Sequence, residues 1–336
     1  MPSVSVLLPV RNAAPWLDDC LDSLARQSLV DHEVVAVDDG SDDGSAALLD
    51  RRAEADSRVR VIHRPARGLV ATLNHGLAHC RAPLVARMDA DDVSHPRRLE
   101  LQTAELASRA DASVVSCLVR HFPRSRVERG FSLYEDWLNS LVSHDDMACE
   151  RFVESPVAHP SVMVRTETLR NAGGWRDVDW AEDYDLWLRL FRDGARFAKV
   201  RRPLFFWREH ESRLTRTDDR YSVGSFLRCK AHFLVRGPLA GGRPVVLWGA
   251  GRTGRRMSKL LTDEGIDIGA VVDIDPTKIG RRLRGAPVID PGELGDHLSR
   301  EVVVLAAVAS RGARELIRKR LVGLGLVEGS TFWCVA

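Results

Sequence analysis

The 336-residue sequence predicts an α/β protein with two domains. Short apolar runs alternate with helix-like patterns up to about residue 120, which is typical of a parallel sheet with helices on both faces. A segment rich in Gly and Pro at 237–244 indicates a linker, and a fresh β-α-β pattern follows it. We therefore expect a Rossmann-like parallel-core sheet over residues 1–240 and a second, small Rossmann-like α/β domain over 241–336.

The individual elements follow from apolar spacing. Val4–Val10 is a continuous apolar run, as expected for a strand buried on both faces. Pro15 is placed to open a helix, because proline suits a first helical turn. Further strands are expected at 33–37, 59–62, 84–88, 245–248 and 270–272, and further helices from about residue 43, over 69–80, around 184–191 and through 257–261. Between about 120 and 175 the pattern is irregular and predicts little regular structure.

Composition excludes several classes of protein. Hydrophobic residues at 44% and charged residues at 29% rule out disorder, collagen and coiled coil. The 49 basic and 47 acidic residues leave a net charge of +2, which does not indicate a nucleic-acid partner. No apolar run is long enough to span a membrane, and no signal peptide is visible. The six cysteines contain no CxxC pair, so we expect buried thiols in a cytoplasmic protein.

An acidic cluster follows the predicted strand at 84–88. Asp89, Asp91 and Asp92 lie at the carboxyl end of that strand, where ligands of parallel sheets bind. Three carboxylates this close repel one another unless a cation lies among them. Oxygen ligands suit magnesium or manganese, so the cluster indicates a divalent cation site. The alternative is a solvated acidic turn that caps the next helix.

The surrounding residues carry a family resemblance. The string ARMDADD at 86–92, followed by HPRRLE at 95–100, closely resembles the DXD region of family-two inverting glycosyltransferases of the GT-A fold. Further segments resemble that family in its order: VSVLLPVRN at 4–12, VDDGSDD at 37–43, Gly68 with NHG at 74–76, HPSVM at 159–163, GGW at 173–175, EDYDLWLRL at 182–190 and REHES at 208–212. The resemblance covers about residues 1–215. It implies a GT-A-type fold and transfer of a sugar from a nucleotide-sugar, UDP-linked, to a glycan or lipid-linked acceptor.

The resemblance also implies a role for each matching residue. Asp39 would accept a hydrogen bond from the base, and the residues implied in nucleotide binding are Pro9, Arg11, Asn12, Asp38, Asp39, Gly68 and Asp89. Asp91 and His210 would hold manganese or magnesium, and the choice among Asp89, Asp91 and Asp92 as direct ligand stays open. Asp183 matches the catalytic base, because a sugar hydroxyl must lose its proton as the new bond forms; Glu182 would share or orient it.

Each of these residues also has an ordinary structural interpretation. Asp38 could be a turn residue, His210 a surface salt-bridge partner, and Glu182 with Asp183 a capping pair. Trp175 could stack on a sugar ring of the acceptor or belong to the core. His159 could line the same cleft or cap a strand.

The second domain contains a dinucleotide-type fingerprint. Gly249, Gly251 and Gly254 fit G-x-G-x-x-G after a predicted strand and at the start of a helix. Asp273 ends the next strand, near where an acidic residue would meet a ribose hydroxyl. This pattern indicates NAD(P) or another nucleotide, and the domain loosely resembles small Rossmann-like modules attached to sugar-modifying enzymes. Tight turns also need glycine without a ligand, so the alternative is a module that dimerises or docks a partner.

The sequence leaves open other functions for the whole chain, an oligomeric state and a contact with the membrane. The chain could be a nucleotide-binding regulatory or scaffolding protein with an inactive transferase domain, or a bifunctional enzyme with an NAD-dependent C-terminal domain. A homo-oligomer is a further expectation. A basic stretch could meet an anionic lipid surface at the inner face of the membrane, or be a solvated linker helix. That stretch contains Arg220, Arg228, Lys230, His232 and Arg236.

Overall fold

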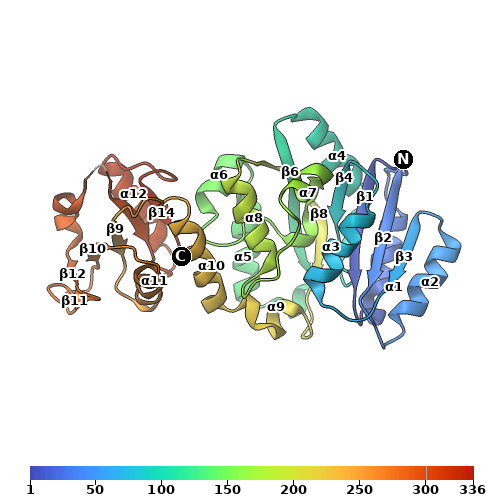
Figure 1. Cartoon of the computed structure of the whole chain (residues 1–336), viewed down its shortest axis with the longest axis horizontal. Coiled ribbons are helices and arrows are strands. Elements are labelled where there is room, and N and C mark those ends of the chain that lie inside the picture. The colour runs from blue at the N-terminus through green and yellow to red at the C-terminus, as the bar shows by residue number, and fades with distance from the viewer. Residues whose placement is uncertain (300) are drawn as a thin grey trace. The chain divides into compact units, whose positions relative to one another are not determined.

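A computed structural model describes residues 1–299 and 301–336 of the chain (Figure 1). They form two compact units. The first comprises Met1–Met147, Pro156–Val178 and Glu182–Thr217; the second comprises Ala148–Ser155, Asp179–Ala181 and Asp218–Ala336. The units thus divide after Thr217, and the predicted domain bounds 1–240 and 241–336 stay a prediction.

Eight strands of the described residues build the sheet of the first unit, in the order β3-β2-β1-β4-β7-β6-β8-β5. The strands are β1 (Val4–Val10), β2 (His32–Asp38), β3 (Val59–His63), β4 (Leu84–Arg87), β5 (Val93–Ser94), β6 (Ala112–Phe122), β7 (Met163–Arg165) and β8 (Arg196–Arg208). The first four are mutually parallel, whereas β7 runs antiparallel to both of its neighbours. The parallel strands therefore end at one common edge, which is where the acidic cluster lies.

Helices pack against this sheet, and the side chains on its two faces belong to two separate hydrophobic clusters. The helices are α1 (Ala14–Ala25), α2 (Ser45–Ala55), α3 (Leu69–His79), α4 (Arg98–Ser108), α5 (Arg129–Ser140), α6 (His144–Glu150), α7 (Thr166–Asn171), α8 (Glu182–Arg192) and α9 (Leu214–Thr217). Val6 and Leu8 of β1 belong to one hydrophobic cluster with residues of α1, whereas Leu7 belongs to another with residues of α3. Because successive side chains of a strand point to opposite faces, both faces of the sheet are covered.

Most predicted elements of the first unit are confirmed. The predicted strand at 4–10 has the bounds of β1, and Pro15 lies in the first turn of α1. The expectation of little regular structure between 120 and 175 was wrong, because α5, α6, β7 and α7 lie there. These elements are short, and α5 buries Glu135, a charged residue that interrupts the apolar pattern. None of the helices in the described residues is long and apolar enough to cross a membrane.

The second unit contains a six-stranded sheet within the described residues, in the order β11-β12-β10-β9-β13-β14. Its strands are β9 (Val245–Trp248), β10 (Ile268–Val272), β11 (Arg282–Leu283), β12 (Ala286–Ile289), β13 (Val303–Ala306) and β14 (Phe332–Cys334), and its helices are α10 (Val223–Val235), α11 (Arg252–Asp263) and α12 (Ala313–Gly323). All neighbouring strands are parallel except β11 and β12.

The second unit also includes two segments from earlier in the chain. Lys230 of α10 donates a hydrogen bond to the carbonyl oxygen of Val153 at 2.7 Å. Glu150 pairs with Arg314 of α12 at 3.0 Å. Both contacts lie within this unit, so residues 148–155, which begin with the last residues of α6, pack with the C-terminal part of the chain.

Candidate active site

Three carboxylates meet where β4 ends. Asp89, Asp91 and Asp92 each offer an oxygen, and these oxygens lie within 4.8 Å of one another. Asp92 is only 1% exposed, and its Oδ2 has no hydrogen-bond partner among the described residues. Burial, followed by the charges of Asp91 and Asp89, raises the pKa of Asp92 well above its usual range. A buried carboxylate oxygen without a donor, beside two further carboxylates, fits a divalent cation.

His210 completes this cluster from a distant part of the sequence. It follows β8, and its Nε2 lies 2.7 Å from Oδ2 of Asp91. Its Nδ1 contacts Oγ of Ser212 at 2.9 Å, and the Trp16 ring stacks on the imidazole with centroids 4.0 Å apart. The structure therefore brings together the two residues that the sequence predicted as metal ligands, Asp91 and His210. Trp16 was not predicted as a site residue.

Arg208 orders the acidic turn. Its backbone N–H donates to Oδ1 of Asp92 at 2.7 Å, and its guanidinium donates to the carbonyl oxygen of Asp91 at 2.6 Å. The same guanidinium pairs with Asp19 of α1 at 2.8 Å. The sequence motif around Arg208 was recognised, but this supporting role was not, because it depends on the antiparallel pairing of β5 with β8.

A second loop group forms at the ends of β1 and β2. Asp39 is 3% exposed and accepts hydrogen bonds from the backbone N–H groups of Arg67 at 2.9 Å and Gly68 at 2.8 Å. Arg11 donates to the carbonyl oxygen of Asp39 at 3.0 Å, and Pro9 is buried within β1. Gly68 has a φ of +87°, a conformation that favours glycine. Four predicted nucleotide residues thus lie along one connected set of loops.

Asn12 and Asp38 tie this loop group to the turn after β2. Asn12 adopts a φ of 50°, and its Oδ1 accepts the N–H of Asp42 at 3.0 Å. Asp38 accepts the N–H of Ser41 at 3.1 Å and contacts Nδ1 of His63 at 3.0 Å. The hydrogen bond to Asp38 is the largest cause that raises the pKa of His63. This geometry favours the turn interpretation of Asp38.

Glu182 and Asp183 begin α8 and have different environments. Glu182 is 1% exposed, and its Oε1 lies 3.7 Å from Nδ1 of His159. Asp183 is half-buried, and its Oδ1 accepts the N–H of Tyr184 at 2.7 Å. The positive end of the helix favours the ionised form of a carboxylate at this position. Of the two carboxylates, Asp183 is the one that an acceptor hydroxyl could reach more easily.

His159 and Trp175 form a buried pair. The indole N–H of Trp175 donates to Nε2 of His159 at 3.0 Å, and Trp175 is only 3% exposed. This burial corrects the prediction that Trp175 stacks on an acceptor sugar, because its ring face is covered; the core alternative holds. His159 is likewise 7% exposed. Burial, and then the charge of Arg87, lowers the pKa of His159 well below its usual range.

Arg87 is a buried cation beside the acidic cluster. It lies in β4, and its guanidinium donates to Oδ1 of Asp89 at 2.6 Å and to the carbonyl oxygen of Met88. Its Nε has no hydrogen-bond partner among the described residues. The charge of Arg87 also contributes to the lowered pKa of His159.

The predicted second-domain residues lie around the loop after β9. Gly249 has a φ of +118°, and a Cβ added there would lie 2.8 Å from Cγ2 of Val308. A Cβ added at Gly254 would lie 1.8 Å from the carbonyl oxygen of Gly249. Packing alone therefore requires these two glycines, whereas Gly251 faces open space.

Asp273 has a different environment from the one predicted. Its Oδ2 accepts the N–H of Ala250 at 2.7 Å, and its Oδ1 accepts the N–H of Asp275 at 2.9 Å. Lys278 contacts both oxygens at 3.3 and 3.4 Å. These bonds hold the glycine loop in place, so Asp273 has a structural role there, and its contact with a ribose hydroxyl stays a prediction.

The predicted membrane-facing stretch does not present one exposed basic face. Lys230 is 5% exposed and is buried against the carbonyl oxygen of Val153. Arg220 pairs with Asp218 at 2.7 Å. Membrane contact stays a prediction that this geometry does not favour.

Comparison with known proteins shows the family of the chain. The model of glycosyl transferase family 2 matches residues 5–170. The chain is 32% identical over 227 residues to the putative glycosyltransferase EpsE of Bacillus subtilis, covering 66% of this chain and 78% of the relative. It is also 32% identical over 202 residues to the amylovoran biosynthesis glycosyltransferase AmsE of Erwinia amylovora, covering 60% of this chain and 73% of the relative.

The fold has a solved counterpart. The structure of S. aureus TarS 1–349 in complex with UDP-GlcNAc matches with a TM-score of 0.58 and 16% identity, covering 78% of this chain and 72% of that TarS fragment. The arrangement is a GT-A-type α/β fold, which confirms the predicted fold class. The chain belongs to glycosyl transferase family 2 and is a glycosyltransferase.

Proposed function

We propose that this enzyme is an inverting, metal-dependent transferase that moves a sugar from a UDP-linked donor to a hydroxyl group of a polysaccharide or lipid-linked acceptor. The observation that carries the proposal is the cluster of Asp89, Asp91 and Asp92 with His210 Nε2 at 2.7 Å from Asp91. The complex of TarS with UDP-GlcNAc and the naming of AmsE for amylovoran biosynthesis support the choice of donor and acceptor.

The donor would bind across two loop groups of the first unit. Asp39 already accepts two backbone N–H groups, and a carboxylate has lone pairs left for an N–H of a pyrimidine base. Arg11 lies beside it and is exposed enough to meet the nucleotide. Asp91 and His210 would hold manganese or magnesium, with Asp92 Oδ2 beside them, and the bound cation would neutralise the departing diphosphate.

Asp183 would act as general base. Its carboxylate accepts the proton of the acceptor hydroxyl while that oxygen attacks the anomeric carbon opposite the leaving nucleotide, which inverts the configuration. Glu182 is too buried to meet the acceptor and would act by holding His159 and the start of α8 in place.

The test is nucleotide release from a panel of UDP-, GDP- and TDP-sugars with manganese. We expect release from one UDP-sugar that is lost in Asp91→Ala. Asp183→Asn should lower turnover by about 10²–10⁴ with donor binding nearly unchanged, because general-base catalysis contributes that much. Asp193→Asn, an exposed change just after α8, is the matched control. Wild-type turnover in Asp183→Asn would exclude it as the base, and absence of release from every donor would favour an inactive regulatory protein.

A further inference from the structure

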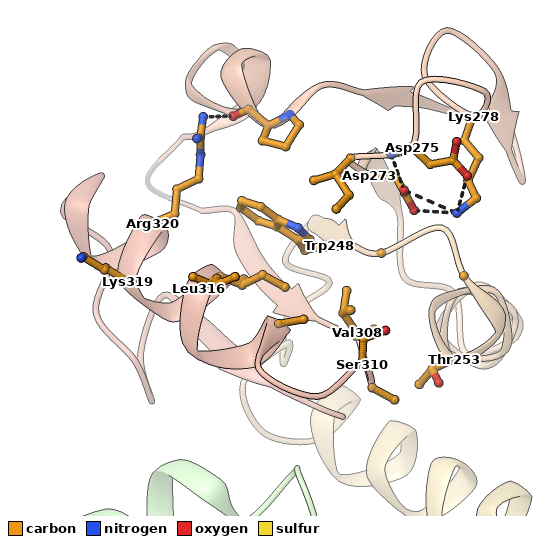
Figure 2. Close-up of a pocket in the computed structure, with 18 of the residues that line it drawn as sticks. Trp248, Thr253, Asp273, Asp275, Lys278, Val308, Ser310, Leu316, Lys319 and Arg320 are labelled. Atoms are coloured by element: carbon orange, nitrogen blue, oxygen red, sulfur yellow. Dashed lines mark hydrogen bonds and ion pairs between the residues drawn. The ribbon is translucent and has the colours of Figure 1, made fainter.

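The second unit contains a large cavity beyond the carboxyl ends of its parallel strands. Its volume is about 1130 Å³, and its lining includes Trp248 at the end of β9, Asp273 just after β10 and Ala307 just after β13 (Figure 2). In open parallel sheets this edge is where ligands bind. Cavities that hold small ligands usually have volumes of about 300–1,000 Å³, so this one is large enough for a whole organic ligand.

Exposed apolar side chains gather around this cavity. Ile274 is 79% exposed, Leu316 is 72% exposed and Leu324 is 44% exposed, and all three line it. In Figure 2 the Trp248 ring lies between the labelled Leu316 of α12 and the loop that carries Asp273. Large apolar groups left in water at the rim of a cavity indicate that a ligand covers them.

The charged lining is predominantly basic. Arg252 begins α11, and Lys319 and Arg320 lie on α12 (Figure 2 labels the latter two). The acidic side chains in the lining are Asp273 and Asp275, and both contact Lys278 at 3.3 Å. With Arg252, Lys319, Arg320 and Lys278 against two aspartates, the lining has more positive than negative charge, which favours an anionic group such as a phosphate.

The glycine loop gives the ligand room on one side. Gly251 lines the cavity and has no atom within 4 Å of an added Cβ, so the backbone there is open to a ligand. Gly249 and Gly254 are required by packing, and Asp273 fixes the loop through the N–H of Ala250. The loop is therefore pre-formed, and its acidic residue already accepts two backbone N–H groups and contacts Lys278.

We propose that the second unit binds a nucleotide in this cavity, with the base against Ile274 and Leu316 and the phosphates next to Arg252, Lys319 and Arg320. This binding activity is additional to the transferase reaction of the first unit. Asp273 is a positioning residue that shapes the loop. Recognition then depends on the apolar rim and the basic side chains rather than on the acidic residue of the sequence fingerprint.

The experiment is calorimetric titration of the full chain carrying Asp91→Ala, in EDTA, with ADP, UDP, GDP and NAD⁺ as separate probes. EDTA and Asp91→Ala disable the proposed metal site, and the comparison of Leu316→Glu with its control assigns any remaining binding to the second unit or to the base-binding loops of the first. We expect saturable binding of at least one probe. Adding Leu316→Glu should weaken it at least about tenfold, which corresponds to about 1.4 kcal/mol, because a carboxylate replaces an apolar contact near the phosphates. Val322→Glu, on the same helix and 55% exposed but outside the cavity, is the matched control.

The outcomes separate this proposal from that of the first unit. A preference for NAD⁺ over ADP would identify a dinucleotide, and the reverse a mononucleotide; both support the proposal when Leu316→Glu removes the binding. Binding of none of the probes at about 1 mM would overturn it. Equal affinity in Leu316→Glu and Val322→Glu would overturn it too, because the nucleotide would then lie elsewhere. Nucleotide release by the transferase is measured separately with Asp91 intact, so either proposal can fail alone.

Discussion

The buried His159 makes the stability of the first unit dependent on pH. An indole N–H can only donate, so the bond from Trp175 requires an unprotonated Nε2 and places the single proton of the neutral ring on Nδ1. Burial and the Arg87 charge hold the pKa of His159 well below its usual range. In the unfolded chain the ring takes up a proton as the pH falls through about 6.5, whereas in the folded protein it does not.

The magnitude follows from this difference in bound protons. Below about pH 6.5, His159 binds one proton more in the unfolded state than in the native state. Its contribution to the unfolding free energy therefore decreases by up to about 1.4 kcal/mol for each unit that the pH falls, and it is level above pH 6.5. At pH 5.0 the loss from His159 is therefore about 2 kcal/mol. In His159→Gln this contribution disappears, because the amide oxygen can accept the Trp175 N–H and does not titrate.

Urea unfolding followed by tryptophan fluorescence at pH 7.0, 6.0 and 5.0 measures this effect. The useful quantity is the difference between wild type and His159→Gln at each pH, because contributions from other titrating groups cancel in it. We expect that difference to shift in favour of the variant as the pH falls. A difference that stays constant from pH 7.0 to 5.0 would refute the reasoning, since His159 would then take up its proton equally in both states.

Two further predictions concern packing around each unit's site. Gly254→Ala should destabilise the second unit by several kcal/mol, because the new Cβ would meet the backbone oxygen of Gly249 at 1.8 Å. Gly251→Ala is the control and should cost about 1 kcal/mol or less, because the space around its Cβ is open. Equal destabilisation of the two variants in thermal unfolding would contradict the packing argument. Trp16→Ala should weaken manganese binding about tenfold, because it releases His210 from the aromatic stack, whereas Trp16→Phe should retain most of the affinity. Titration calorimetry measures the manganese affinity of each variant. Unchanged affinity in Trp16→Ala would show that the stack does not position His210.

The sequence predicted those parts of the fold in which local pattern and tertiary environment agree. Val4–Val10 is apolar throughout because β1 is buried on both faces, so its bounds could be predicted. In α5 the carboxylate of Glu135 is buried and accepts a hydrogen bond from Nδ1 of His121 at 2.8 Å. A buried charge with a partner in another element interrupts the apolar periodicity, and this helix was therefore missed.

The candidate active site likewise has some contacts that local sequence patterns predict and others that they do not. Motif strings assigned Asp91 and His210 to one site, and the structure has their side chains in contact. The stacking of Trp16 on His210 joins residues almost two hundred positions apart, and no local pattern carries that information. Asp273 matched the fingerprint by spacing, but its hydrogen bond to the N–H of Ala250 depends on backbone conformation, which spacing alone does not reveal.

The interleaving of the two units has a consequence for how the chain folds during synthesis. Residues 148–155 leave the ribosome long before Arg314, which pairs with Glu150. Val335, whose carbonyl oxygen accepts a hydrogen bond from the Lys230 amine, is made later still. All of these residues belong to the second unit. Until translation is nearly complete, Glu150 therefore lacks its partner Arg314, while the sequence neighbours of this segment on both sides can already pack. On a ribosome stalled before residue 314, the first unit could fold while residues 148–155 remained unprotected. A protease pulse would then cleave the chain within those residues.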